Sequence, residues 1–225
     1  MKYINISKSI LFSSCCAIIT SWATENTFQL KLGDLLFQDT NCGEFCDSIN
    51  SATTGYHKAM ISHVAMVVNL HPEMIIEANT HGVSISKLNQ FLQTSLDNES
   101  NPRVMVGRLT KLYQPLIPSA IQYAMQQVNK PYNQTFIANN ESSFYCSELI
   151  ERSFYFANHN HPVFQQVPMN FKDNKTQQIS PIWLDYFSQL NESTPQGKLG
   201  TNPGFMSQES IINIIHYYGE LRTTQ

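Results

Sequence analysis

The sequence has few charged residues and no long run of basic ones. Charged residues make up 14% of the 225 residues and hydrophobic residues 42%, a balance that supports a folded core and argues against disorder. The formal net charge is -3. A protein that binds nucleic acid through electrostatics would carry a basic patch or stripe. We therefore expect no nucleic-acid partner.

The apolar run near the N-terminus is too short and too poorly flanked for a transmembrane helix. Residues 10–22 are mostly apolar or small and carry no charge. Lys2 and Lys8 give the segment before them a positive charge. Ser-Trp-Ala at residues 21–23 puts small residues at the positions that a signal peptidase reads. We expect a signal peptide over residues 1–23 and membrane contact only through this segment. The alternatives are an uncleaved anchor and a poorly matched lipoprotein signal at Cys15 or Cys16.

Cysteine is scarce once that segment is removed. Only Cys42, Cys46 and Cys146 remain, and an odd count leaves one thiol unpaired in an oxidising compartment. Cys42 and Cys46 are spaced to close a small disulfide loop, which would leave Cys146 free. Two reduced loop thiols are an equally good interpretation. A metal pair lacks a matching second pair with ligand spacing, so we expect no metal and no other cofactor.

The order of apolar segments predicts an α+β fold. We find no internal repeat, low-complexity tract or linker, so residues 24–225 are expected to form one domain. Early strands followed by helices favour a sheet with helices packed against it. The expected strands cover residues 35–37, 64–70, 74–78, 83–85 and 103–109.

Three helices are expected in the second half of the chain. The first begins near Pro118 and ends before Lys130, and the second covers residues 146–157. The third opens at residues 180–181, Ser-Pro, with three side chains facing inward: Trp183, Leu184 and Phe187. Residues 38–60 are rich in Ser, Thr, Asn and Gly and are predicted as a long loop, which is often functional. Residues 211–218 fit a strand or a helix.

Cys146 is a candidate nucleophile because it stands where a polar loop becomes a helix. Backbone N–H groups and the helix dipole favour a thiolate at a helix N-terminus. The same N–H groups can donate to an oxyanion that forms beside the sulfur. The alternative is a buried, inert cysteine on the core-facing side of the helix, since free cysteine is among the most buried residue types.

His63 is the candidate base, at the start of an apolar strand. A thiol nucleophile needs a nearby base, and imidazole titrates in the useful range. The alternative is a structural histidine with satisfied hydrogen bonds. His216, in the apolar tail, is a candidate core residue. The other histidines are expected on the solvated surface: His57, His71, His81, His159 and His161.

Glu77 is an acidic residue inside an apolar strand, where it is costly unless paired. Residues 63 and 77 flank the turn at Pro72, so a hairpin centred near residues 70–71 would place them almost directly opposite each other. A carboxylate there can orient the imidazole and select its tautomer. The alternatives are a salt bridge at the strand edge and a solvent-facing glutamate.

Taken in order, four short motifs resemble a known family. They are Gly-Asp-Leu-Leu-Phe at residues 33–37, Ser-His-Val at 62–64, Glu-Ala at 77–78 and Tyr-Cys-Ser-Glu-Leu-Ile at 145–150. The arrangement resembles the YiiX-like, permuted branch of the NlpC-type papain-like hydrolases, over most of residues 30–155. In this branch the histidine strand precedes the cysteine helix, as it does here.

The resemblance implies a circularly permuted papain-like fold of the α+β class. A curved antiparallel sheet would carry the histidine and pack against the helix that carries the cysteine. The implied roles are nucleophile for Cys146, base for His63 and orienting residue for Glu77. Beside them we single out Tyr145 and Ser62 as candidates for substrate contact; ring packing and strand capping are the alternatives.

The resulting functional hypothesis is a secreted bacterial cysteine hydrolase, periplasmic or extracellular, that cleaves a cell-wall peptide or another small amide through an acyl-enzyme. One alternative is a lipid acyl hydrolase or acyltransferase on the same fold, with a lipid-like substrate. Lipid-acting relatives usually carry the cysteine motif Asn-Cys-Glu-His-Phe, which this chain lacks. Another alternative is a non-catalytic binding module that uses the same cleft.

Overall fold

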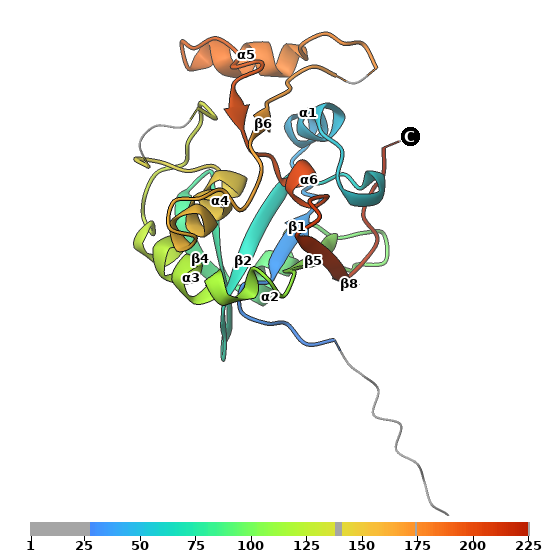
Figure 1. The fold of residues 1–225 in the computed structure, drawn as a ribbon. Coiled ribbons are helices and arrows are strands. Elements are labelled where there is room, and N and C mark those ends of the chain that lie inside the picture. The colour runs from blue at the N-terminus through green and yellow to red at the C-terminus, as the bar shows by residue number, and fades with distance from the viewer. Residues whose placement is uncertain (1–27, 138–140, 174, 225) are drawn as a thin grey trace, which may run out of the picture.

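A six-stranded antiparallel sheet with the strand order β4-β3-β2-β1-β5-β8 organises the computed structural model, and a two-stranded sheet, β6-β7, stands beside it (Figure 1). The structure describes residues 28–137, 141–173 and 175–224, so the predicted signal peptide at residues 1–23 lies outside the described part. The expected α+β class, an antiparallel sheet packed against helices, is confirmed.

The elements follow one another along the chain from sheet-rich to helix-rich. The strands are β1 Leu35–Gln38, β2 His63–Leu70, β3 Glu73–Asn79, β4 Gly82–Lys87, β5 Val104–Leu109, β6 Val167–Pro168, β7 Leu199–Gly200 and β8 Ile212–Tyr217. The α-helices are α1 Glu44–Ala52, α2 Leu88–Leu92, α3 Ile117–Gln126, α4 Cys146–Ala157, α5 Pro181–Gln189 and α6 Pro203–Met206. Two 3₁₀ turns are η1 Tyr56–Lys58 and η2 Gln114–Leu116.

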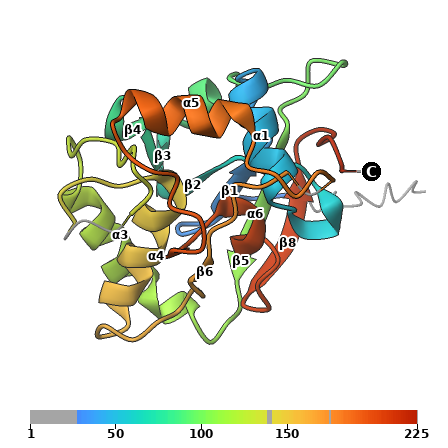
Figure 2. The same cartoon turned by 90° about the horizontal axis from the view of Figure 1, so that it is seen from above.

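The central strand β1 is buried on both faces, which explains its unbroken apolar sequence. Leu35 and Phe37 belong to the larger core, between the sheet and the helices α3 and α4. Leu36 belongs to a second core on the other face, where Leu88 and Phe91 of α2 pack. Viewed from above, α3 and α4 lie together on one face of the sheet (Figure 2).

Helix α4 covers the predicted range of residues 146–157. Leu149, Ile150 and Phe154 repeat at helical spacing and are fully buried in the larger core. This packing fixes the position of α4 relative to β2, because Val64 and Met66 of β2 belong to the same core. The sheet and α4 therefore position the two ends of the candidate site.

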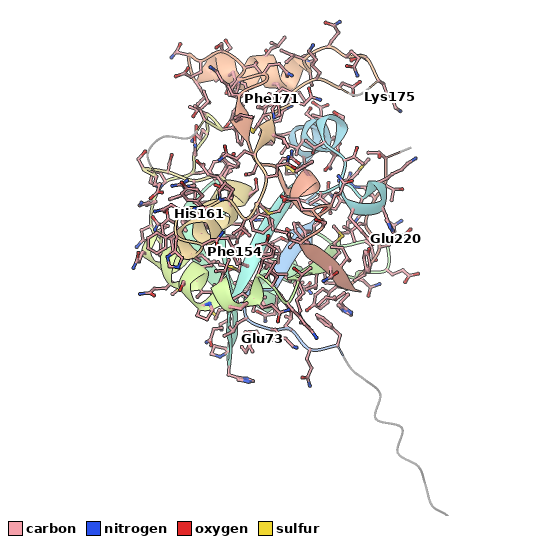
Figure 3. All side chains as sticks on the ribbon, in the orientation of Figure 1. Glu73, Phe154, His161, Phe171, Lys175 and Glu220 are labelled. Carbon is pink, nitrogen blue, oxygen red and sulfur yellow. A yellow bond between two sulfur atoms is a disulfide. The ribbon has the colours of Figure 1, made fainter. Side chains whose placement is uncertain are left out.

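A third, aromatic cluster lies under α5, apart from the main core. Trp183 and Phe187 of α5 pack with Phe171, and Phe45 of α1 packs against them. Figure 3 shows Phe171 directly beneath α5, whereas Phe154 lies within the body of the molecule. The prediction that Leu184 faces inward is wrong: it is 52% exposed. One residue advances a helix by about 100°, so Leu184 turns away from the face that residues 183 and 187 share.

The prediction of a loop over residues 38–60 is also wrong, because helix α1 and the turn η1 lie inside it. The helix escaped detection because its buried face includes polar side chains, Ser48 and Asn50, instead of an apolar stripe. Serine and asparagine are also weak helix formers. Phe45 and Ile49, one turn apart, are the side chains that join it to the aromatic cluster.

The tail at residues 211–218 is a strand, β8, that pairs with β5 at the edge of the sheet. Ile212 lies opposite Leu109 and is buried, and Ile214 lies opposite Gly107. Burial alternates along β8 because its outward side chains have no covering layer. Tertiary pairing thus decided between the two structures that the sequence allowed.

Candidate active site

Cys146 is the first residue of α4 and the free cysteine of the described chain. Tyr145 before it is extended, and the first hydrogen bond of the helix runs from the Leu149 N–H to the Tyr145 carbonyl at 3.0 Å. The N–H groups of the first turn therefore point out of the helix toward its N-terminal end, where they favour negative charge. The sulfur lies at the electropositive end of α4, as the sequence predicted.

The other two cysteines are joined in a disulfide between Cys42 and Cys46, with Cα atoms 5.3 Å apart. Of the interpretations open from the sequence, the structure has the disulfide. Cys46 is also the third residue of α1 and is buried. The bond therefore fastens the start of α1, whose other end lines the pocket described below.

His63 and Glu77 form a hydrogen-bonded pair between adjacent strands. His63 Nε2 lies 2.6 Å from Glu77 Oε2, and both side chains are largely buried. Since Nε2 contacts the carboxylate, Nδ1 is the ring nitrogen left for another partner. The paired interpretation of Glu77 therefore applies, and the solvent-facing one does not.

The register of this pair differs from the prediction of two directly opposite residues. Leu70 faces Glu73 across a two-residue turn, and after a bulge at residues 67–69 Met66 faces Ile76. Glu77 is therefore level with residue 65, and His63 is its diagonal neighbour. The turn is centred between residues 71 and 72, slightly later than predicted. Long side chains still meet across such a diagonal.

Electrostatics make this a charged site. Burial lowers the pKa of His63, but hydrogen bonding and charge from Cys146 and Glu77 outweigh burial and raise that pKa to about 10. Burial likewise raises the pKa of Glu77, and its bond to His63 outweighs this and lowers it. An imidazolium flanked by a carboxylate and a sulfur is the result. The structure thus brings together Cys146, His63 and Glu77.

A small pocket opens beside Cys146. Its walls come from α1, α4, α5, the turn around residue 136 and the β6–β7 region. The large side chains that line it are Ile49, Tyr132, Phe136, Met169, Phe171 and Trp183. A group bound at Cys146 would therefore lie against an apolar, mostly aromatic surface.

Tyr145 and Ser62, predicted as substrate contacts, both line this pocket. The Tyr145 hydroxyl accepts a hydrogen bond from the Thr201 N–H at 3.0 Å, so the ring is anchored to the chain next to β7. The Ser62 hydroxyl accepts from the Thr40 N–H at 3.1 Å and is also bonded to the Thr40 hydroxyl. Both residues shape the pocket, and substrate contact by either stays a prediction.

The sequence analysis did not single out two buried polar residues close to the candidate nucleophile, Glu148 and Asn133. Glu148 Oε2 accepts from the Tyr145 N–H at 3.2 Å and from Asn133 Nδ2 at 3.0 Å. Burial raises the pKa of Glu148 to about 7, against the opposing effect of these hydrogen bonds. A glutamate at the third helical position is a start signal, but the residue before the helix is a tyrosine, so the usual pattern was incomplete.

The remaining histidines do not reach the site. His216 is half-buried and stacks on Phe28, with ring centroids 4.0 Å apart. The other five lie on the surface, as expected: His57, His71, His81, His159 and His161.

Two kinds of feature are absent from residues 28–137, 141–173 and 175–224. No group of three or more His, Cys, Asp or Glu side chains is placed to hold a metal ion there. None of the helices in this part of the chain has both the length and the apolar character needed to span a bilayer.

Comparisons with known proteins agree with this geometry. Residues 29–214 match the model of a family described as permuted papain-like amidase enzymes, YaeF/YiiX, C92 family. Among solved structures, the chain is similar to a crystal structure described as that of the metalloprotein yiiX from Escherichia coli O157:H7, with a TM-score of 0.67 and 19% identity. The match covers 84% of this chain and 98% of that one. No curated protein matches the sequence. The expected permuted papain-like fold is thereby confirmed.

Proposed function

This chain belongs to the YaeF/YiiX, C92 family of permuted papain-like amidases, and we propose that it hydrolyses an amide bond with Cys146 as nucleophile, His63 as base and Glu77 as orienting residue. The observation that carries the proposal is the row of three groups, Glu77, His63 and Cys146, which ends at the pocket because Cys146 lines it. His63 Nε2 is 2.6 Å from Glu77 Oε2, and hydrogen bonding and charge from Cys146 raise the pKa of the same ring. Nucleophile, base and orienting acid are the parts that such chemistry needs.

In the proposed reaction, the thiol proton resides on His63, so that Cys146 reacts as a thiolate beside the imidazolium. The thiolate attacks the amide carbonyl carbon, and the Cys146 N–H at the start of α4 donates to the oxyanion. His63 then gives its proton to the leaving nitrogen as the C–N bond breaks, which leaves a thioester. Water attacks the thioester, His63 accepts the water proton, and the carboxylic acid leaves with the thiol regenerated.

Glu77 supports this cycle without touching the substrate. Its bond to Nε2 directs Nδ1 toward the sulfur and favours the charged ring. Because Glu77 and His63 lie on adjacent, hydrogen-bonded strands of one sheet, the backbone keeps the two side chains within reach of each other. Glu77 is therefore a positioning residue in this scheme.

For the substrate we propose a small amide or peptide, such as a cell-wall peptide, met outside the cytoplasm of a bacterium. The export step is supported by the basic, apolar and small residues of the N-terminal segment. No nucleic acid is involved, since neither charge nor composition favours one.

A second candidate, hydrolysis or transfer of a lipid acyl group, is favoured by the pocket itself. Its lining by Phe136, Phe171 and Trp183 suits an apolar chain next to the sulfur. The thiolate chemistry is the same for an ester as for an amide. A binding module without catalysis would not need the charged Cys146–His63–Glu77 row.

The first prediction tests the nucleophile. At pH 6, iodoacetamide should alkylate Cys146 at least about tenfold faster in the wild type than in His63→Ala, because a free thiol with a pKa near 8.5 is almost wholly protonated there. Mass spectrometry of the Cys146 peptide gives the rate. His216→Ala, in another half-buried strand histidine, is the matched control and should label like the wild type.

Slow, equal labelling of the wild type and His63→Ala would favour the inert-cysteine interpretation. The substrate classes are separated by incubation with peptidoglycan fragments and with phospholipid vesicles, followed by mass spectrometry. New carboxylate products from the peptide fraction alone support the amidase. Fatty-acid release, or an acyl group retained on Cys146, would move the assignment to the lipid reaction.

A further inference from the structure

A buried polar pair lies directly behind the candidate nucleophile. Asn133 is 1% exposed and Glu148 is 6% exposed. A single carboxylate oxygen, Glu148 Oε2, accepts from the Tyr145 N–H at 3.2 Å and from Asn133 Nδ2 at 3.0 Å. Tyr145 immediately precedes Cys146, so this oxygen links the start of α4 to a distant segment of the chain.

That segment is the turn at residues 133–137, and the Asn133 side chain holds the turn through hydrogen bonds within it. Asn133 Nδ2 also donates to the Ile137 carbonyl at 2.8 Å. Asn133 Oδ1 accepts from the Thr135 N–H at 3.2 Å and from the Thr135 hydroxyl at 2.9 Å. A side-chain amide has two N–H donors and one oxygen. All of them are used, within the turn or on Glu148.

The turn presents Phe136 to the pocket. Phe136 has φ 56, in the left-handed region that a bulky residue rarely adopts, so its surroundings must hold it there. Its ring contacts Tyr145 at a centroid distance of 5.6 Å and Trp183 at 5.9 Å. Phe136 therefore forms the part of the pocket wall that faces both the nucleophile's helix and α5.

We propose that Glu148 and Asn133 are positioning residues that fix Cys146 and the Phe136 wall of the pocket relative to each other. The pair thereby sets how an apolar substrate group lies against the sulfur. The inference rests on the proposed function only in taking Cys146 as the reacting group. Two donors converge on one oxygen, an arrangement that a charged acceptor strengthens.

The test compares three variants with Trp183 as the fluorescent probe, because Trp22, the other tryptophan, lies within the predicted signal peptide at residues 1–23. Acrylamide quenching of Trp183 fluorescence reports the pocket wall, and alkylation of Cys146 by iodoacetamide reports the nucleophile. Glu148→Ala removes the shared acceptor, Glu148→Gln keeps an acceptor oxygen, and Glu151→Gln is the matched control. Glu151 is also buried on α4, with a pKa that burial raises, but it is one turn further along.

Glu148→Ala should raise the quenching constant of Trp183 about twofold and slow alkylation about five- to tenfold, as expected for the loss of a helix-start interaction. Glu148→Gln should recover most of both losses. Glu151→Gln should change neither readout, because its side chain does not hold Tyr145 or the turn at residues 133–137.

A swap of donor and acceptor gives an independent check. Asn133→Asp places a carboxylate against Glu148 and should resemble Glu148→Ala in both readouts. Adding Glu148→Gln supplies a new donor to Asp at position 133 and should recover at least half of each loss. A purely local effect at either position would not be reversed by a change at the other.

The proposal is overturned if Glu148→Ala matches the wild type in both readouts, or if Glu151→Gln has an equal effect. Should Glu148→Ala fail to fold by circular dichroism, the Asn133→Asp variant and its double mutant decide: no rescue overturns the pairing. Trp183 quenching does not depend on thiol chemistry. An inert Cys146 would therefore sink the proposed function while the quenching result still tests the wall.

Discussion

The ionised state of His63 is held by two side chains of different kinds. Burial lowers its pKa, and the contributions of Cys146 and Glu77 outweigh burial. A histidine whose pKa lies at about 10 stays protonated throughout the neutral range. An imidazolium that persists places a positive charge beside Cys146 before any substrate arrives.

We expect Glu77→Gln to lower the pKa of His63, because glutamine offers an oxygen acceptor but no charge to the imidazolium. The imidazolium should then lose its proton at a lower pH than in the wild type, and the rate of Cys146 alkylation should fall above that pH. NMR titration of the His63 ring measures the shift. Glu73→Gln, in an exposed residue at the start of the same strand, is the control. An unchanged His63 titration in Glu77→Gln would contradict the assigned role of Glu77.

Single residues were predictable where chemistry marked them in the sequence. Cys146, His63 and Glu77 each stood out as a reactive or charged group in an apolar element. Asn133 and Glu148 did not, because their importance comes from one hydrogen bond between segments fifteen positions apart. The aromatic wall was invisible for the same reason: Phe136 and Trp183 meet only after folding.

Among the elements, β7 and Thr201, which directly follows it, are connected to the start of α4. The Tyr145 hydroxyl accepts from the Thr201 N–H at 3.0 Å, and the Thr201 hydroxyl donates to the Ser147 hydroxyl at 3.0 Å. Gly200 lies against the same tyrosine: an added Cβ would be 2.6 Å from Met169 Sδ and 3.0 Å from Tyr145 Oη. A glycine here lets the strand approach both side chains.

Gly200→Ala should therefore lower the free energy of unfolding by about 1–3 kcal/mol, as overpacking of a filled site does. Urea denaturation followed by circular dichroism gives the value. Leu199→Ala is the matched control on the same strand, because Leu199 is 62% exposed and should cost no more than about 0.5 kcal/mol. A Gly200→Ala protein as stable as the Leu199→Ala protein would mean that Met169 moves aside freely.

Elements with a regular apolar period were predicted well, and irregular ones were not. Helix α4 and strand β1 follow their patterns closely. Helix α1 was predicted as loop because its buried face includes Ser48 and Asn50. The β2–β3 register differed from the prediction because a turn centre is set by which two residues form the turn, and apolar alternation alone leaves that choice open.

At the scale of the whole molecule, a buried ion pair joins the C-terminal segment to the end of β1 in the sheet. Asp39, fully buried just after β1, accepts from Arg222 Nη2 at 2.7 Å and from Arg222 Nε at 2.9 Å. Arg103 Nη1 approaches the same carboxylate at 3.4 Å. The bidentate geometry joins residues 183 positions apart. It holds the chain end beside α1, whose Asp47 also contacts Arg222.

Arg222→Ala should cost about 3 kcal/mol in the free energy of unfolding, because it removes the bidentate guanidinium and leaves the buried Asp39 carboxylate with the backbone N–H of residue 222 and the longer Arg103 contact. Arg152→Ala is the matched control: it breaks the more exposed pair with Glu141 and should cost less than about 1 kcal/mol. Equilibrium urea unfolding compares the two. Equal losses would show that burial of Asp39 does not make its ion pair the stronger one.

The sequence by itself determined the reactive groups and the main elements, because a cysteine at a helix start and a histidine on an apolar strand are local patterns. The resemblance of its short motifs to a known family also predicted the permuted papain-like fold. Only the tertiary structure decided the pocket, the Asn133–Glu148 link and the diagonal meeting of His63 with Glu77. Each of these depends on side chains from distant segments, whose mutual distances follow from packing and leave no periodic mark in the sequence.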